Sequence, residues 1–174
     1  MKTFSLILLI CSLVAIQMCE YKNGKFYRRE HKYSLILPKG WKEDFRTEDG
    51  ISFIAPEHTH GGKTDATINV LFYNFVDEIT LDSFYELIKN EGGLISDKII
   101  EEGLASVDSY LAKWTLIDYG GTSQGAPAKR KRYIIVTDPH SAYIIEFMVH
   151  YKYEDFGKYK EIFENFINNF DIKR

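Results

Sequence analysis

Apolar side chains recur at every second position along much of this chain, and this pattern constrains the fold more than any other feature. In "ATINVLFYNF" the apolar residues Ile68, Val70 and Phe72 occupy alternate positions. A period of two places these side chains on one face of a β-strand. The same pattern predicts strands over residues 26–31, 32–37, 41–45, 51–55, 67–75, 95–100, 110–119, 132–137 and 142–151. We therefore expect a domain built mainly on β-sheet.

Short turn sequences connect several of these predicted strands. Asp49-Gly50 is a dipeptide typical of β-hairpins, and it separates the predicted strands 41–45 and 51–55. "DPHS" at residues 138–141 has the Asp, Pro and Ser composition of a turn. Strands that follow one another through such short turns pair in the antiparallel direction. The predicted sheet is therefore antiparallel.

Two segments have helical rather than strand periodicity. Between the potential N-cap Thr80 and the stop at Gly92-Gly93, apolar residues recur at spacings of three and four, as on one face of a helix. The C-terminal segment has a longer stripe of the same kind: Phe156, Tyr159, Ile162, Phe163, Phe166, Ile167 and Phe170. Each stripe can cover one face of a sheet. The predicted fold class is α+β, an antiparallel β-sheet sandwiched between helices (α/β/α).

The stretch "YSLILPKGW" ends a predicted strand in a sharp corner. Pro38 cannot donate a backbone hydrogen bond, and Gly40 can adopt conformations that other residues resist. Trp41 follows immediately, so the corner can direct its large ring beneath the sheet. We predict that Trp41 is a buried structural residue rather than part of a functional site.

The first residues have the pattern of a secretory leader. Lys2 supplies a positive start, and residues 4–16 form a nearly continuous apolar run that is shorter than the ~20 residues of a spanning helix. We expect residues 1–19 to be a signal peptide, residues 20–25 to be a tether and residues 26–174 to be one domain. The protein is then exported, to the periplasm or the cell surface.

Cys19 leaves two interpretations of the leader open. In the first, "AIQMC" is a lipoprotein cleavage site, and Cys19 is acylated and provides the only attachment to the membrane. Gln17 and Met18 depart from the usual lipobox, which has a small residue before the cysteine. In the second, ordinary cleavage occurs near Ala15. Both cysteines, Cys11 and Cys19, lie in this region, so no disulfide can hold the predicted domain together.

Charge argues against a nucleic-acid ligand. The chain of 174 residues has a formal net charge of −3 and a pI of about 6.0, with 45% hydrophobic residues. Proteins that bind nucleic acids usually have a strongly basic surface. The composition is instead that of a globular domain with enough apolar residues to form a core.

Several motifs together resemble the PsbP-like family, which takes its name from an extrinsic subunit of photosystem II. The motifs are "YSLILPKGW", "GISFIAP", "ATINV", "LDSFYELIKN" and "FENFINNF", and they extend over residues 26–174. The resemblance implies an antiparallel sheet between helices in a small exported protein or lipoprotein. It also implies that the protein binds and stabilises a partner protein, as the better-understood members do, and the family has no common catalytic motif.

The residues themselves offer one candidate metal site and no catalytic motif. His58 and His60 in "EHTHGGKTD" could place two imidazoles on the same side of an extended segment, as zinc or copper ligands. The alternative is a polar loop. No Gly-x-Ser-x-Gly sequence occurs, and no cysteine follows Cys19. We therefore expect a protein that is not an enzyme and that needs no cofactor, with a metal ion as the alternative.

The most concentrated charge is "KRKR", which consists of Lys129, Arg130, Lys131 and Arg132 and follows a glycine-rich link at residues 120–128. Together with Tyr119 at the start of the link, these residues are our candidates for binding a protein partner. The alternative is a solubilising edge that prevents aggregation of strands. Two functions thus remain open: a noncatalytic envelope protein that binds a protein partner, and a metal or small-ligand module centred on His58 and His60.

Overall fold

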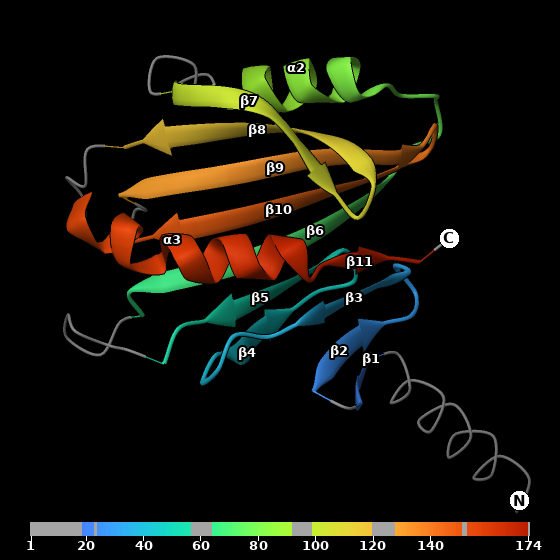
Figure 1. Cartoon of the computed structure of the whole chain (residues 1–174). Helices are drawn as coiled ribbons and strands as arrows, with labels where there is room; N and C mark the ends of the chain where they lie inside the picture. Colours follow the sequence, from blue (N-terminus) through green and yellow to red (C-terminus); the bar gives the residue numbers. More distant parts are fainter. Residues whose placement is uncertain are drawn as a thin grey trace, which may run out of the picture.

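Two β-sheets and two α-helices account for most of the described part of the chain (Figure 1). The computed structural model describes residues 19–22, 24–56, 64–91, 99–119, 128–150 and 153–173. The helices are α2 (Leu81–Glu91) and α3 (Tyr153–Asn168). Within these ranges, neither helix has the length and apolar character needed to cross a membrane.

The larger sheet contains seven strands of the described chain, in the order β4-β5-β6-β10-β9-β8-β7. Neighbouring strands pair in the antiparallel direction throughout this sheet. Its strands are β4 (Lys42–Arg46), β5 (Gly50–Ile54), β6 (Ala66–Asn74), β7 (Ile99–Val107), β8 (Tyr110–Asp118), β9 (Lys129–Asp138) and β10 (Ser141–Val149). The predicted α+β class and antiparallel pairing are therefore confirmed.

The N-terminal strands form a separate small sheet, which the periodicity does not predict. Its four described strands are β1 (Cys19–Lys22), β2 (Lys25–Arg28), β3 (Tyr33–Ile36) and β11 (Asp171–Ile172), in the order β1-β2-β3-β11. Residues 20–25, which the sequence predicts to be a tether, instead include most of β1 and the turn into β2. Backbone pairing of β1 with β2, and the ring contact of Tyr21 with Phe26 at 5.1 Å, account for this order.

The main core lies between the larger sheet, the small sheet and α3. Phe147 of β10 stacks on Phe163 of α3 with ring centroids 4.5 Å apart, and Tyr33 of β3 stacks on Phe170 at 5.2 Å. The side chains that the larger sheet contributes occupy alternate positions: Ile51, Phe53, Ile68, Val70, Tyr133, Ile135, Tyr143, Ile145 and Phe147. The sequence alternation therefore marks the α3 side of this sheet.

A second, smaller core lies beneath α2. Phe84, Tyr85 and Ile88 of α2 pack against Ile134 of β9 and Ile144 of β10. Ile144 belongs to this smaller core, whereas its neighbours Tyr143 and Ile145 belong to the main core. The two cores therefore lie on different faces of β10, with α2 on one face and α3 on the other. In Figure 1, α2 lies near the β7–β8 edge of the sheet, and α3 crosses in front of the central strands. The rest of the α2 side is therefore not contacted by this short helix.

The predicted Pro-Gly corner has the expected geometry. Gly40 has a φ of +83°, which a side chain would resist, and the Trp41 N–H donates to the Pro38 carbonyl at 3.1 Å. Trp41 is only 6% exposed and makes T-shaped contacts with the rings of Tyr159 and Phe163, at 6.1 and 6.3 Å between centroids. The prediction that Trp41 is a buried structural residue is confirmed.

Two strands extend beyond their predicted limits. The prediction of a strand over 95–100 misses most of β7, which continues to Val107, because Glu101, Glu102 and Gly103 interrupt the alternation. β7 is an edge strand, so charged side chains there remain in solvent. β9 begins at Lys129 rather than at Arg132, so the whole basic run belongs to a strand.

Candidate functional site

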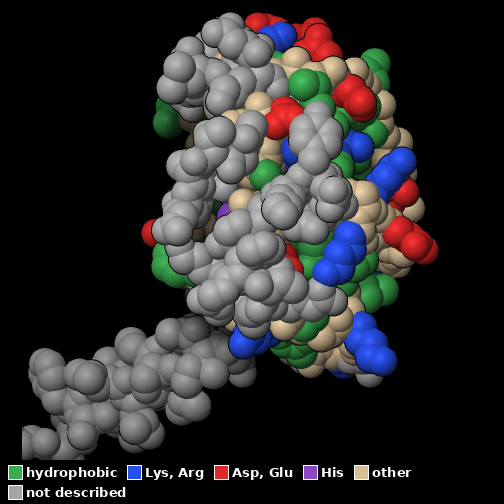
Figure 2. All heavy atoms as spheres, turned by 90° about the vertical axis from the view of Figure 1, so that its left-hand side faces the viewer, with side chains coloured by type: hydrophobic (Ala, Val, Ile, Leu, Met, Phe, Trp, Pro, Cys, Tyr) green, Lys and Arg blue, Asp and Glu red, His purple; other side chains and the backbone are tan. Residues whose placement is uncertain are grey.

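The basic run does not form the exposed cluster that the sequence predicts. Lys129, Arg130, Lys131 and Arg132 are the first residues of β9, which lies between β8 and β10. The alternative of a solubilising edge is also wrong, because β9 pairs on both sides. In Figure 1 the start of β9 lies at the left edge of the sheet, and Figure 2 views the molecule from that side, where basic and acidic side chains are interspersed on the coloured surface.

The two lysines of the run face the α3 side of the sheet. The Lys129 ammonium lies 5.7 Å from the centroid of the Phe156 ring of α3. The Lys131 ammonium lies over the rings of Trp114 and Tyr133, at 4.3 and 5.3 Å. Both cations are placed over aromatic faces, which attract positive charge. These lysines therefore help to attach the sheet to its aromatic neighbours.

The two arginines face the other side, where they meet one buried carboxylate. Arg132 Nε and Nη2 lie 2.8 and 2.7 Å from Glu146 Oε1. Asn69 Nδ2 lies 3.5 Å from the other oxygen, Oε2. Glu146 stands directly opposite Arg132 on β9 and Asn69 on β6, so three adjacent strands contribute to this network. A buried carboxylate needs such partners, because burial without them is costly.

Arg130 is a second cation beside the same carboxylate. Its Nη1 lies 3.6 Å from Glu146 Oε1, which is longer than a hydrogen bond, and its guanidinium lies 5.3 Å from the Tyr119 ring centroid. The side chain of Arg130 is 20% exposed. Glu146 is therefore shared by two guanidinium groups, of which Arg132 makes the hydrogen bonds. Tyr119 and Arg130, two of the predicted binding residues, are in contact.

His150, just past the end of β10, extends this polar surface. Its Nε2 lies 3.2 Å from Thr67 Oγ1, and its backbone N–H donates to the Asp65 carbonyl at 3.0 Å. Burial, and then the charge of Arg130, lower the pKa of His150, whereas the charge of Asp65 acts in the opposite direction. His150 is thus held mainly in its neutral form near neutral pH.

A groove runs beside these polar groups on the same face of the sheet. It has a volume of about 470 Å³ and is lined mainly by β4, β5, β6 and the end of β10. Phe45 on its wall is 61% exposed, although it is a large aromatic residue. Met148, which also lines the groove, stands directly opposite Arg130 in the sheet register. We call this surface, formed by Phe45, Leu71, Met148 and His150 with Arg130 at its border, the sheet groove.

A pH-dependent stability follows from the environment of His150. Because the folded state disfavours its protonated form, the stability that His150 contributes is complete above about pH 6.5, the ordinary histidine pKa of an unfolded chain. That stability decreases as the pH falls toward the lower folded-state pKa. We expect the Tm to fall less between about pH 7.5 and about pH 5 in His150→Gln than in wild type.

The exposed His140 provides the control for this comparison, since His140→Gln removes a histidine from a turn without changing the groove. Differential scanning calorimetry at matched ionic strength measures the decrease. If His150→Gln and wild type lose the same Tm over this interval, the neutral state of His150 does not contribute to stability.

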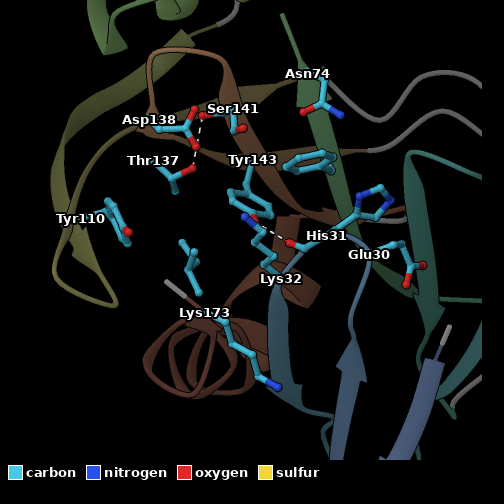
Figure 3. A pocket seen from close by; sticks show the side chains of 12 residues that line it. Glu30, His31, Lys32, Asn74, Tyr110, Thr137, Asp138, Ser141, Tyr143 and Lys173 are labelled. Carbon is cyan, nitrogen blue, oxygen red and sulfur yellow. Dashed lines mark hydrogen bonds between the residues drawn. The ribbon is translucent and has the colours of Figure 1, made fainter.

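A second, polar pocket of about 310 Å³ lies between the two sheets (Figure 3). The Tyr143 hydroxyl donates to the His31 carbonyl, and the His31 ring bonds the Glu48 carbonyl. Burial, and then the charge of Asp138, raise the pKa of Tyr143, so its hydroxyl remains a donor. In Figure 3 the Lys173 side chain points away from the other lining residues. The inner groups of this pocket are therefore engaged in joining the two sheets.

The remaining candidates lie partly or wholly outside the described residues. His58 and His60 fall in the undescribed segment 57–63, and the glycine-rich link falls in 120–127. Residues 1–18 of the predicted leader are also outside, and Cys19 is the first residue of β1. Within the described ranges, no three His, Cys, Asp or Glu side chains are grouped so that they could hold a metal ion.

Sequence reasoning missed Phe45, Asn69, Glu146, Met148 and His150. A usable signal was present in the strands of the core: polar residues recur at every second position, opposite apolar ones. Thr67 and Asn69 in β6 follow this pattern, and Glu146 and His150 at β10 follow it in part, because Met148 lies between them. A buried strand with one polar side indicates a face that meets solvent or a ligand rather than a second apolar layer.

Comparison with known proteins identifies the fold. No family model and no curated protein sequence matches the chain. Among solved structures, the solution structure of the PsbP protein of the cyanobacterium Synechocystis (CyanoP) matches with a TM-score of 0.56 and 12% identity, over 85% of this chain and 91% of that one. The chain has a PsbP-like fold. The resemblance inferred from the sequence motifs is thereby supported at the level of structure.

Other PsbP-like matches extend this comparison. LpqN, a protein involved in cell envelope biogenesis of Mycobacterium tuberculosis, matches with a TM-score of 0.58 and 8% identity, over 82% of this chain and 83% of that one. The Ran-binding protein Mog1p of Saccharomyces cerevisiae matches with 0.52 and 9%, over 88% and 96%. A Bacteroides thetaiotaomicron protein matches with 0.57 and 16% over 88% of this chain, which spans 50% of that protein's length. At these identities the likeness concerns the fold alone.

Proposed function

We propose that this chain is a noncatalytic protein of the cell envelope that binds a protein partner at the sheet groove. The observation that carries the proposal is the exposed Phe45 beside an arginine-bordered apolar groove. Aromatic residues, methionine and arginine are enriched at protein interfaces, and charged lysine is depleted there. Phe45, Met148 and Arg130 provide this combination on one face of the sheet.

The comparisons support a binding role. Mog1p is a Ran-binding protein, and LpqN is involved in cell envelope biogenesis, so PsbP-like structures include a protein binder and an envelope protein. A shared fold does not by itself define a function, so the proposal rests on the residues of the sheet groove. We also infer the sandwich arrangement of the PsbP-like family, with α2 and α3 covering opposite faces. Because α2 is short, it covers only part of one face of the larger sheet, and the rest of that face remains for a partner.

The groups at the groove are suited to binding rather than catalysis. Glu146 is held by Arg132, and His150 is hydrogen-bonded to Thr67 and lies near Arg130. A general base must be able to take a proton from a substrate, whereas Glu146 is already held by two cations. These interactions fix the polar side chains in place, which favours recognition of a partner without a reaction.

We further propose that the chain is exported, with residues 1–19 removed as a leader or with Cys19 acylated. Export fits the apolar run that follows Lys2 and the lack of cysteine beyond Cys19. Both modes place the domain outside the cytoplasm, in the periplasm or at the cell surface. The partner is then a protein of the envelope.

Phe45→Ser tests the proposed function. Truncation of an aromatic anchor in an interface commonly costs about 2 kcal/mol or more, so capture of the partner should fall at least about tenfold. The melting temperature should change little, because Phe45 is 61% exposed. The measurement is affinity capture from envelope extracts, with each co-purified protein quantified by mass spectrometry against an unrelated bait.

Leu111→Ser is the matched control, because Leu111 is 57% exposed on β8 and does not line the groove. It removes a similar exposed apolar side chain from another place on the sheet. The proposal requires that a set of proteins captured by wild type and by Leu111→Ser is depleted with Phe45→Ser. Equal capture by all three proteins would show that the groove is not the binding surface.

A further inference from the structure

We propose that Arg130 binds a carboxylate of the partner, so that the recognised element is an acidic side chain flanked by apolar ones. This inference rests on the proposed function and specifies the chemistry at the sheet groove. Its basis is the juxtaposition, on one face of the sheet, of an arginine without a full counter-charge and an apolar groove with the exposed Phe45.

The first step is the charge balance around Glu146. Both hydrogen-bond distances to Glu146 Oε1, 2.8 and 2.7 Å, belong to Arg132. Arg130 approaches the same oxygen only to 3.6 Å, and among the described residues its other contact is the Tyr119 ring. One carboxylate therefore serves two guanidinium groups. The neighbouring His150 adds no negative charge, and the buried carboxylate of Asp65 makes no direct contact with Arg130. A positive charge thus remains on Arg130.

The second step is the effect of burial on this charge. The side chain of Arg130 is only 20% exposed, and that of Glu146 is 9% exposed. Electrostatic interactions are stronger where water is largely excluded, and a partly buried cation gains most from an anion that reaches it directly. The planar guanidinium can donate two parallel hydrogen bonds to a carboxylate. Arg130 should therefore bind a carboxylate that reaches it directly more strongly than a distant, solvated counter-ion.

An anionic lipid surface fits the basic run less well than a protein carboxylate does. Binding to anionic headgroups relies on several cations on one exposed surface. Here the basic run is divided, because Lys129 and Lys131 lie over aromatic rings on the α3 side. Arg132 is occupied by Glu146. Within the basic run Lys129–Arg132, Arg130 alone remains for an anion on the groove side, and one guanidinium matches one carboxylate.

The third step concerns the residues next to the acidic one. Met148, the cross-strand neighbour of Arg130, lines the groove, and Leu71 and Phe45 lie further along it. Cross-strand neighbours are about 5 Å apart, and an extended peptide rises about 3.3 Å per residue. An acidic side chain at Arg130 therefore places the next one or two residues of the partner over Met148. Apolar side chains at those positions would enter the groove.

The test is selection of a random peptide library on the full chain, followed by measurement of one selected peptide. We expect enrichment of Asp or Glu next to apolar residues. Arg130→Gln should weaken binding of the selected peptide at least about tenfold, since hydrogen bonds to charged groups are the stronger ones. Replacement of the acidic residue of the peptide by its amide should cause the same loss. With Arg130→Gln already present, that replacement should cause no further loss.

Lys131→Gln is the matched control, because it removes the same charge from the adjacent residue on the other side of β9. Its affinity for the peptide should stay within about twofold of wild type. The peptide amide keeps the test informative even if Arg130→Gln perturbs the fold, because it leaves the protein unchanged.

Four results would overturn the inference. Selected peptides without an acidic residue, or an acidic peptide that binds equally well as its amide, would remove Arg130 from recognition and leave the proposed groove intact. No enrichment at all would contradict both the inference and the proposed function. Binding to phosphatidylglycerol vesicles that falls equally in Arg130→Gln and Lys131→Gln, without peptide binding, would assign the basic strand to a membrane surface.

Discussion

Replacement of Trp41 by alanine is expected to lower the free energy of unfolding by about 3–5 kcal/mol. The indole is 6% exposed and makes T-shaped contacts with two rings of α3. Its removal leaves a cavity between the Pro-Gly corner and the helix, in a core that is otherwise closely packed. Urea denaturation monitored by circular dichroism measures the loss.

Phe45→Ala provides the comparison for Trp41, since it removes another aromatic ring that is 61% exposed. Exposed substitutions usually change stability by less than about 0.5 kcal/mol. A loss of only a few tenths of a kcal/mol in Trp41→Ala would mean that the ring contributes little to the core. The corner would then have to be considered as a contact for a partner.

The second large effect is expected for Arg132→Met, which should cost about 3 kcal/mol. The change removes the hydrogen bonds to Glu146 and leaves a carboxylate buried without its main partner. Broken buried ion pairs cost about 3–5 kcal/mol, and the lower end applies here because Arg130 remains 3.6 Å away. The unfolding free energy of the variant, from urea denaturation at low salt, tests this value.

The double variant Arg132→Met/Glu146→Met separates two energy terms: the lost attraction between the two side chains, and the cost of burying the Glu146 carboxylate without its partner. Because both charges are then absent, most of the stability should return. If Arg132→Met alone costs less than about 0.5 kcal/mol, Glu146 is solvated better than its burial indicates. The result also shows how far Arg132, one of the four cations of "KRKR", acts as a structural partner of Glu146.

Local pattern predicts the elements of this fold well and their assignment to sheets poorly. The alternation in β6 and β10 and the aromatic stripe of α3 are properties of short segments, so they can be recognised without a structure. The separate small sheet depends on β11, a strand of two residues that pairs with β3 from the other end of the chain. No periodicity can be read from two residues, and pairing at that distance is decided by packing.

The candidate site shows the same division. The sequence identifies "KRKR" and Tyr119, because charge and aromatic character are visible in the letters. Which cations face the groove depends on the register of β9 against β10, and this is set by all the core residues of both strands. Phe45 comes from β4, and three strands separate β4 from β9 in the sheet order, so its place beside the groove follows only from the completed sheet.

The position of β1 has a consequence for where an acylated form of the protein could work. A flexible segment of six residues would let the domain move about 20 Å from a lipid anchor. Because β1 begins at Cys19 and pairs with β2, no such flexible segment separates an anchor on Cys19 from the small sheet. An acyl chain on Cys19 would hold the small sheet at the headgroups and restrict the orientations of the whole domain. Its partner would then have to present the acidic segment close to the bilayer surface rather than far from the membrane.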